Sequence, residues 1–223
     1  MTTSGTTTFN PDISEIIEEA YERIGVESAT GYDVRTARRS LNLLGLEWSN
    51  RQVNLWTIES LSVPLVAGTK TYSLPADTVD VLDVVIRTTN AGSNTDLAIG
   101  RLSVGDYSAI PTKDTPGRPV QFYMDRQIAA PLITVWPVPA DASYTLVYWR
   151  MRRIQDTGLD GSVTADVQAR AIPALVAGLA YYLAMKRAPD RLQETKLIYD
   201  EQWAMMADED RERAGFTVRP RIG

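Results

Sequence analysis

The two ends of the chain show the residue spacing of helices and the middle shows that of strands, and this contrast most restricts the possible folds. Near the start, residues 10–25 predict a first helix with Asn10 as its N-cap, Pro11 at its first position and Gly25 at its stop. A single apolar stripe recurs every three or four residues: Ile13, Ile16, Ile17, Ala20, Tyr21 and Ile24. A second stripe predicts a helix from about Asp33, formed by Val34, Ala37, Leu41, Leu44 and Trp48. These two helices can pack as a helical hairpin.

From Leu55 the pattern changes to short extended runs separated by turn residues. The runs 55–66 and 70–74 are separated by Ala-Gly-Thr, which predicts a β-hairpin. Residues 103–110 predict a short helix. In 120–125, apolar Val120, Phe122 and Met124 alternate with polar residues, as a half-buried strand requires. The middle of the chain therefore predicts a mostly antiparallel sheet or small sandwich.

Helical patterning returns after Asp160. Residues 166–187 predict a long helix in which Pro173 lies in the first turn or causes a kink. Its apolar run, residues 171–185, is shorter than the roughly 20 residues of a membrane span, so a buried helix is predicted. A last helix follows Pro189, and Gly215 is its predicted stop.

The predicted fold class is α+β, a helical bundle built from N- and C-terminal helices with an inserted, mostly antiparallel β-sheet lobe and an extended C-terminal tail. Residues 10–54 and 160–213 form the helical lobe, and residues 55–159 form the β-rich lobe. Residues 214–223 form the extended tail.

Composition narrows the chemistry. The chain has no cysteine and no histidine, which excludes thiolate zinc sites, cysteine nucleophiles and the Ser-His-Asp triad. Gly-rich phosphate loops and calcium loops are also absent from the sequence. We therefore expect a protein that is not an enzyme and has no catalytic, cofactor or metal site.

The start of the chain shows no secretory signal. The formal net charge is -5, so the chain as a whole is not suited to wrapping nucleic acid.

Two groups of arginines are candidates for inter-subunit or phosphate contacts: Arg35, Arg38 and Arg39 on the second helix, and Arg150 and Arg152 on one face of a strand. Salt bridges to the many acidic residues or to an acidic partner are the favoured interpretation, and phosphate contact is the alternative. The glutamates Glu15, Glu18, Glu19 and Glu22 are predicted to form a solvated helix face.

The C-terminal sequence Phe-Thr-Val-Arg-Pro-Arg-Ile-Gly has no acid, and its apolar residues are interspersed with two arginines. Pro220 disfavours a helix there. A frayed terminus is one interpretation, and a docking peptide that orders against a partner is the favoured one. The predicted docking residues are Phe216, Val218, Arg219, Arg221 and Ile222.

Two blocks carry a family resemblance. Residues 41–87 contain Trp48, Arg51, Leu55, Trp56, Gly68, Tyr72, Leu74 and Pro75, and residues 117–150 contain Pro119, Tyr123, Pro137, Pro139 and Tyr148. In this order they resemble the head-to-tail adaptor (connector) proteins of short-tailed phages, also called tail accessory factors, packaged-DNA stabilisation proteins or tail tubular proteins A.

The resemblance implies a structural virion protein of the neck or tail, assembled in the host cytoplasm. Such adaptors form a ring, usually of twelve copies, beneath the portal protein. The ring extends the DNA channel, retains packaged DNA until ejection and gives the tail nozzle protein its platform. It contacts passing genomic DNA without sequence specificity, and the C-terminal arm attaches to the portal.

Three alternatives remain open. One is another ring protein of the neck or tail. The second is a peptidoglycan hydrolase that uses two carboxylates, an activity credited to some members of the resembling family. The third is a DNA-binding module that uses the arginines, for which affinity for duplex DNA would fall steeply with salt.

Overall fold

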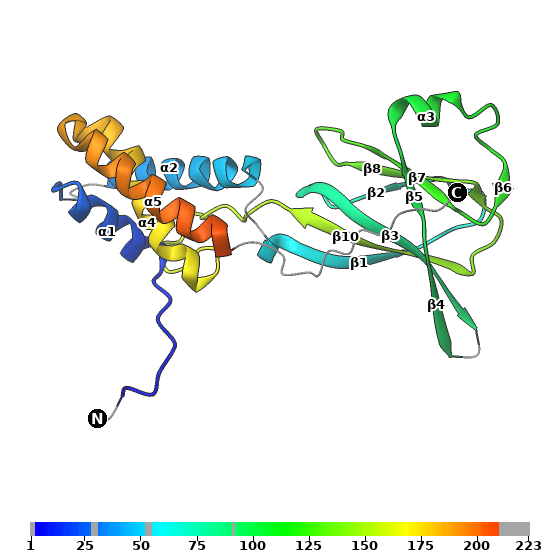
Figure 1. Ribbon diagram of the computed structural model, residues 1–223, viewed down its shortest axis with the longest axis horizontal. Helices are drawn as coiled ribbons and strands as arrows, with labels where there is room; N and C mark the ends of the chain where they lie inside the picture. Colours follow the sequence, from blue (N-terminus) through cyan, green and yellow to red (C-terminus); the bar gives the residue numbers. More distant parts are fainter. Residues whose placement is uncertain (1–2, 28–30, 52–54, 91, 210–223) are drawn as a thin grey trace, which may run out of the picture. The chain divides into compact units, whose positions relative to one another are not determined.

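The computed structural model describes residues 3–27, 31–51, 55–90 and 92–209 of the 223-residue chain. The chain divides into two compact units, one formed by residues 1–56 and 154–223 and the other by residues 57–153. We call them the helical unit and the β unit. The predicted α+β fold class, with helices from both ends of the chain and an inserted sheet lobe, is confirmed (Figure 1).

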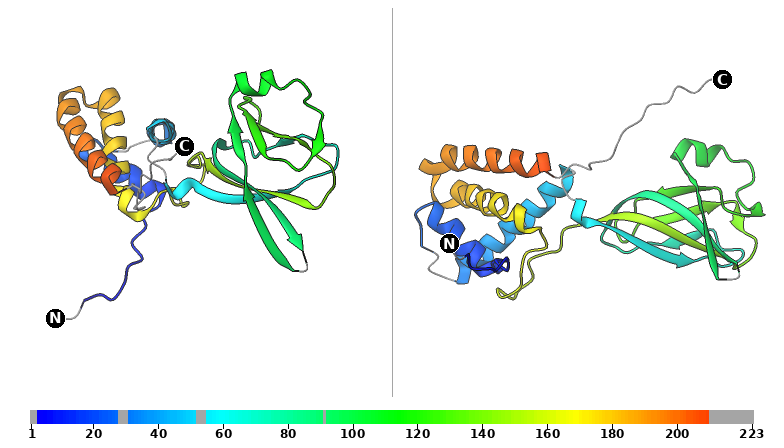
Figure 2. Two further views of the ribbon diagram at one scale, coloured as in Figure 1. Left: turned by 45° about the vertical axis from the view of Figure 1, so that its right-hand side comes forward. Right: turned by 60° about the horizontal axis from the view of Figure 1, so that its bottom comes forward.

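The described part of the helical unit contains four helices: α1 (Ile13–Arg23), α2 (Gly31–Asn50), α4 (Ile172–Arg187) and α5 (Leu192–Glu209). Short 3-10 turns lie at η1 (Leu55–Thr57), at the boundary with the β unit, η2 (Ala169–Ala171) and η3 (Pro189–Arg191). The central helix is α4, which packs against α1, α2 and α5 (Figure 2). It is apolar on almost every side, as a helix surrounded by others must be.

Close packing of α4 depends on its small residues. A Cβ added at Gly178 would lie 2.7 Å from Leu44 Cδ2 and 2.9 Å from Tyr199 Cε2. Both neighbours are buried, so a larger residue at position 178 would push α2 and α5 away from α4. Pro173 lies in the first turn of α4, where a missing backbone N–H costs nothing.

The predicted start of α1 is wrong by two residues. The N-cap is Asp12, not Asn10, and Pro11 precedes the helix. Asp12 and Glu15 form a capping box, in which each side chain accepts a hydrogen bond from the other residue's backbone N–H at 2.9 Å. The reciprocal pair satisfies two helix-terminal donors, whereas Asn10 could satisfy only one.

The β unit contains two four-stranded sheets with the orders β1-β10-β3-β4 and β2-β8-β7-β5. The first sheet consists of β1 (Ile58–Pro64), β10 (Tyr144–Arg152), β3 (Thr78–Asn90) and β4 (Ser93–Ala98). The second consists of β2 (Thr71–Ser73), β8 (Leu132–Trp136), β7 (Gln121–Asp125) and β5 (Gly100–Leu102). The remaining elements are α3 (Val104–Ala109), β6 (Pro116–Gly117) and β9 (Val138–Pro139).

Most strand pairs are antiparallel, as predicted; β5 with β7 and β6 with β9 are parallel. One apolar core joins both sheets, and its members include Val84, Ile86, Phe122, Ile133 and Leu146. The predicted short helix at 103–110 is α3, with a capping box of Ser103 and Asp106.

Two local predictions in the β unit are wrong. The runs around Ala-Gly-Thr do not form a hairpin: β1 pairs with β10, and β2 pairs with β8 in the other sheet. The turn instead carries the chain from one sheet to the other, and buried Leu65 and Leu74 flank it in the shared core. Val120 is 45% exposed because it precedes β7 and does not face the core as Phe122 and Met124 do.

Candidate functional site

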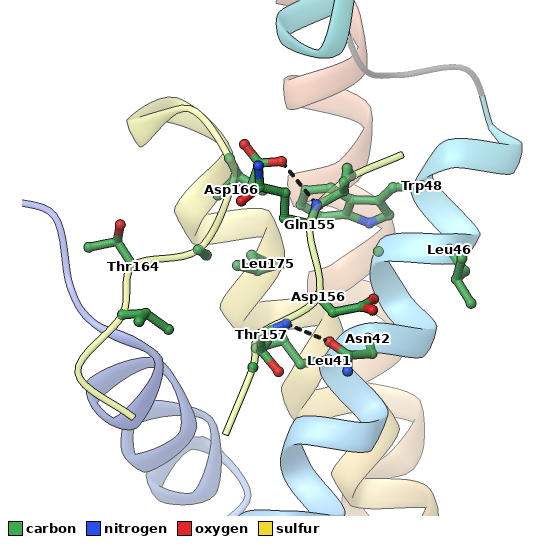
Figure 3. A pocket seen from close by; sticks show the side chains of 16 residues that line it. Leu41, Asn42, Leu46, Trp48, Gln155, Asp156, Thr157, Thr164, Asp166 and Leu175 are labelled. Atoms are coloured by element: carbon green, nitrogen blue, oxygen red, sulfur yellow. Dashed lines mark hydrogen bonds between the residues drawn. The ribbon is translucent and has the colours of Figure 1, made fainter. Parts of the chain in front are cut away.

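A cavity of about 210 Å³ lies in the helical unit between α2 and the segment 154–167 (Figure 3). Its apolar wall comes from α2, the segment and α4: Leu41, Leu46, Trp48, Ile154 and Leu175. Two hydrogen bonds from backbone N–H groups to side-chain oxygens fix the conformation of this segment. The Thr157 N–H donates to Asn42 Oδ1 at 3.0 Å, and the Gln155 N–H donates to Asp166 Oδ2 at 2.9 Å (Figure 3).

The polar chemistry of this cavity is limited. Thr157 is 8% exposed, and its Oγ1 has no hydrogen-bond partner among the described residues. Asp166 also lines the cavity, but its carboxylate already accepts the Gln155 N–H. The Thr157 hydroxyl oxygen is itself buried, so the wall of the cavity offers mainly apolar surface.

At the C-terminal end of α2, Glu47 accepts hydrogen bonds from two tyrosines. Tyr182 OH donates to Glu47 Oε2 at 2.7 Å, and Tyr199 OH donates to Glu47 Oε1 at 3.1 Å. The Trp48 Nε1–H donates to the Tyr199 hydroxyl oxygen at 3.1 Å. Arg51 pairs with Glu47 and lies 4.6 Å from the ring centre of Trp203. This network joins α2, α4 and α5, and we call it the Glu47 network.

The phenols of the Glu47 network are held in their neutral form. Burial and the hydrogen bond to Glu47 raise the pKa of Tyr182 to about 12. Burial also raises the pKa of Tyr199. Both pKa shifts keep the phenols protonated at neutral pH, so each can donate its hydrogen bond. The network therefore stabilises the packing of α2, α4 and α5 at neutral pH.

The three predicted arginines of α2 have different surroundings. Arg35 is exposed and its Nε–H donates to the Gly31 carbonyl at 3.3 Å, while Arg39 is exposed farther along α2. Arg38 is partly buried and donates to the Leu159 carbonyl. Its Nε is buried without a hydrogen-bond partner among the described residues. Arg38 thus helps to hold the segment 154–167, and Arg35 and Arg39 remain at the surface.

The two predicted arginines of β10 meet around one carboxylate in the β unit. Arg150 is 5% exposed and donates to Glu59 Oε1 at 2.7 Å, to Asp77 Oδ1 at 2.6 Å and to Thr78 Oγ1 at 2.7 Å. Arg152 Nε lies 3.8 Å from Glu59 Oε2. The hydrogen bond from Arg150 lowers the pKa of Asp77. The structure thus places Arg150 in ion pairs within the β unit.

The glutamates of α1 lie on its outer side. Glu15 belongs to the capping box and Glu19 pairs with Arg23 at 2.8 Å, while Glu18 and Glu22 are exposed. No cluster of three or more potential metal ligands occurs among the described residues. Within the same ranges, no helix is long and apolar enough to cross a membrane.

The predicted docking residues Phe216, Val218, Arg219, Arg221 and Ile222 lie outside the described residues. Within the described residues, the sequence did not predict two features, the cavity and the Glu47 network. The position of Glu47 next to Trp48 on an amphipathic helix was an available signal for the network. The cavity had no such signal, because residues 154–167 form neither a helix nor a regular strand.

Several apolar side chains of the helical unit remain on its surface. On α2, Leu43 and Leu46 are 48% and 42% exposed, and on α5, Leu197 and Met205 are 71% and 51% exposed. These side chains are apolar surface that a partner could cover.

The model of the SU10 adaptor protein family matches residues 11–221. The chain belongs to the SU10 adaptor protein family. The predicted resemblance is therefore confirmed at the level of an adaptor protein, and the narrower family of short-tailed phage adaptors stays a prediction.

No curated protein matches the chain. Among solved structures, a chain in "Neck of empty GTA particle computed with C6 symmetry" is 12% identical, with 92% of both chains covered and a TM-score of 0.29. A TM-score of 0.29 is too low to indicate a shared fold.

Proposed function

We propose that this protein is a head-to-tail adaptor of a virion neck, which forms a ring of identical copies beneath the portal protein. The family match over residues 11–221 carries the proposal. In this role the ring extends the DNA channel, helps to retain packaged DNA and gives the tail nozzle protein a platform. Twelve copies, assembly in the host cytoplasm and a place in the virion belong to the same proposal.

The described surface supports self-association through the helical unit. Exposed Leu43 and Leu46 lie on α2 together with the cations Arg35 and Arg39, and α1 carries exposed glutamates. Ring neighbours need two different surfaces that fit each other, and surfaces of opposite charge with apolar side chains between them meet that need. The net charge of -5 suits a channel wall that does not hold passing DNA by counterion release.

The C-terminal residues 216–223 are proposed as the portal-binding arm. Deleting them is expected to leave a folded protein that no longer joins the portal. Mass measurement of the full chain and of the deletion variant, each alone and mixed with isolated portal, tests this. Assembly of the deletion variant on the portal at the affinity of the full chain would contradict it. A turbidity assay on peptidoglycan with the same samples tests the hydrolase alternative directly.

A further inference from the structure

An apolar groove runs along α4 between α1 and α5. Its larger part, a hollow of about 510 Å³, is floored by Ile172, Pro173 and Val176 of α4 and bordered by Ile16 of α1. A second hollow of about 230 Å³ is lined by Ala177, Ala180 and Ile198. Arg23 lines both hollows, and their α4 lining residues Pro173, Val176, Ala177 and Ala180 recur at helical spacing, so both hollows open on one face of α4.

The sides of this groove are acidic. Glu15 and Glu19 of α1 line the larger hollow, and Glu194 of α5 lines the smaller one. Arg23, the one cation among the described lining residues, is paired with Glu19 through an Nε–Oε1 contact of 2.8 Å. An extended peptide that carries apolar residues and unpaired cations therefore fits this groove in shape and charge.

The chain itself contains such a peptide. Residues 216–222, Phe-Thr-Val-Arg-Pro-Arg-Ile, combine three large apolar side chains with two arginines and no acid. Pro220 restricts the backbone to extended conformations at its own position and at Arg219. Apolar residues for the floor and cations for the acidic sides are thus present in one short segment.

The segment is also within reach. The described residues end with α5 at Glu209, and α5 runs antiparallel to α4, so its end lies near the start of α4 (Figures 1 and 2). Six residues separate Glu209 from Phe216, and an extended chain of that length spans at most about 20 Å. Because packed helices lie about 8–10 Å apart, the larger hollow is within this span.

We propose that residues 216–222 bind in the α1–α4–α5 groove of their own chain, with Phe216 and Val218 in the larger hollow and Ile222 toward the smaller one. This goes beyond portal attachment, because it gives the arm an acceptor site in the free protein. Attachment to a partner would then require release of the arm from its own groove. A tethered segment has a high effective concentration at its own site, which favours the intramolecular complex.

The absence of cysteine makes a cross-linking test direct. Ile198→Cys at the groove combined with Gly223→Cys is expected to form an intramolecular disulfide under mild oxidation, seen as a faster-migrating monomer on a non-reducing gel. The control pair is Leu197→Cys with Gly223→Cys. Leu197 is the adjacent residue of α5, is more exposed at 71% against 41%, and does not line the groove. The Ile198 pair is expected to close several-fold faster.

Charge reversal gives the second readout. Glu194→Lys is expected to slow closure of the Ile198 pair, whereas Glu201→Lys, exposed on the same helix but outside the groove lining, leaves it unchanged. Equal closure rates for the Ile198 and Leu197 pairs would overturn the proposal. A disulfide-linked dimer would show that the groove takes the segment of a second copy, which also overturns the intramolecular form. The assay contains no portal, so failure of portal attachment does not affect its outcome.

Discussion

The helical unit contains a partly buried carboxylate, Glu47, and the β unit contains a buried guanidinium, Arg150, and the two are stabilised by opposite chemistry. In the helical unit, Glu47 accepts hydrogen bonds from Tyr182 and Tyr199. In the β unit, Arg150 donates to Glu59 and Asp77. The first arrangement fails when phenols lose protons, and the second fails when carboxylates gain them. The two units should therefore respond to opposite extremes of pH.

The largest effect is expected at the aromatic part of the Glu47 network. Trp48 is fully buried, and Trp48→Ala is expected to cost about 3–5 kcal/mol of unfolding free energy because a large cavity forms. Denaturant unfolding followed by helical circular dichroism measures it. Trp149→Ala in the β unit is the matched control, because that side chain is 37% exposed and should cost less. Equal losses for both variants would show that Trp48 does not organise the helical unit.

The next effect is alkaline. The pKa of Tyr182 is raised from 10.0 to about 12, so its contribution is fully present below pH 10 and is lost as the pH rises toward 12. Between pH 9 and pH 11.5, the full chain should lose roughly 2 kcal/mol more helical-unit stability than Tyr182→Phe. Tyr32→Phe, at a residue that is 63% exposed, is the control and should behave as the full chain does. If all three proteins showed the same pH dependence, Tyr182 would not be the group that causes the alkaline loss of stability.

The smallest effect is acidic and belongs to the β unit. The pKa of Asp77 is lowered from 3.8, so its ion pair stabilises above pH 3.8 and is lost as the pH falls below that value. The Asp77 side chain is 46% exposed, so the loss should be about 1 kcal/mol or less. Hydrogen exchange in β10 at pH 5 and pH 2.5 measures it. Asp77→Asn should reduce the difference between the two pH values, whereas exposed Asp83→Asn should preserve it. A difference that Asp77→Asn leaves unchanged would refute the role of this pair.

Sequence patterns predicted helices better than they predicted strand partners. The stripe Ala37, Leu41, Leu44 and Trp48 is buried in α2 as predicted, because helical periodicity is set by residues close in sequence. The run that became β1 was recognised as extended, but its partner is β10, more than eighty residues away. A local turn sequence cannot report such a partner, because the shared core of two sheets decides it.

The arginine sites and the Glu47 network also depend on contacts that local sequence does not show. Arg35, Arg38 and Arg39 look alike in sequence, yet Arg38 alone donates to the carbonyl of Leu159, far along the chain. Arg150 and Arg152 both lie near Glu59, and only the fold brings Glu59 and Asp77 to Arg150. The Glu47 network depends on a carboxylate and two phenols from three helices, and sequence spacing does not encode that meeting.

By itself, the sequence determined the α+β class, the helical faces and the exclusion of thiol and imidazole chemistry, because these depend on composition and short-range periodicity. Only the tertiary structure decided which strands share a sheet, which arginine is buried, and where the cavity and the α1–α4–α5 groove lie. Those features arise where distant segments compete for the same buried surface, and the outcome depends on the packing of the whole unit.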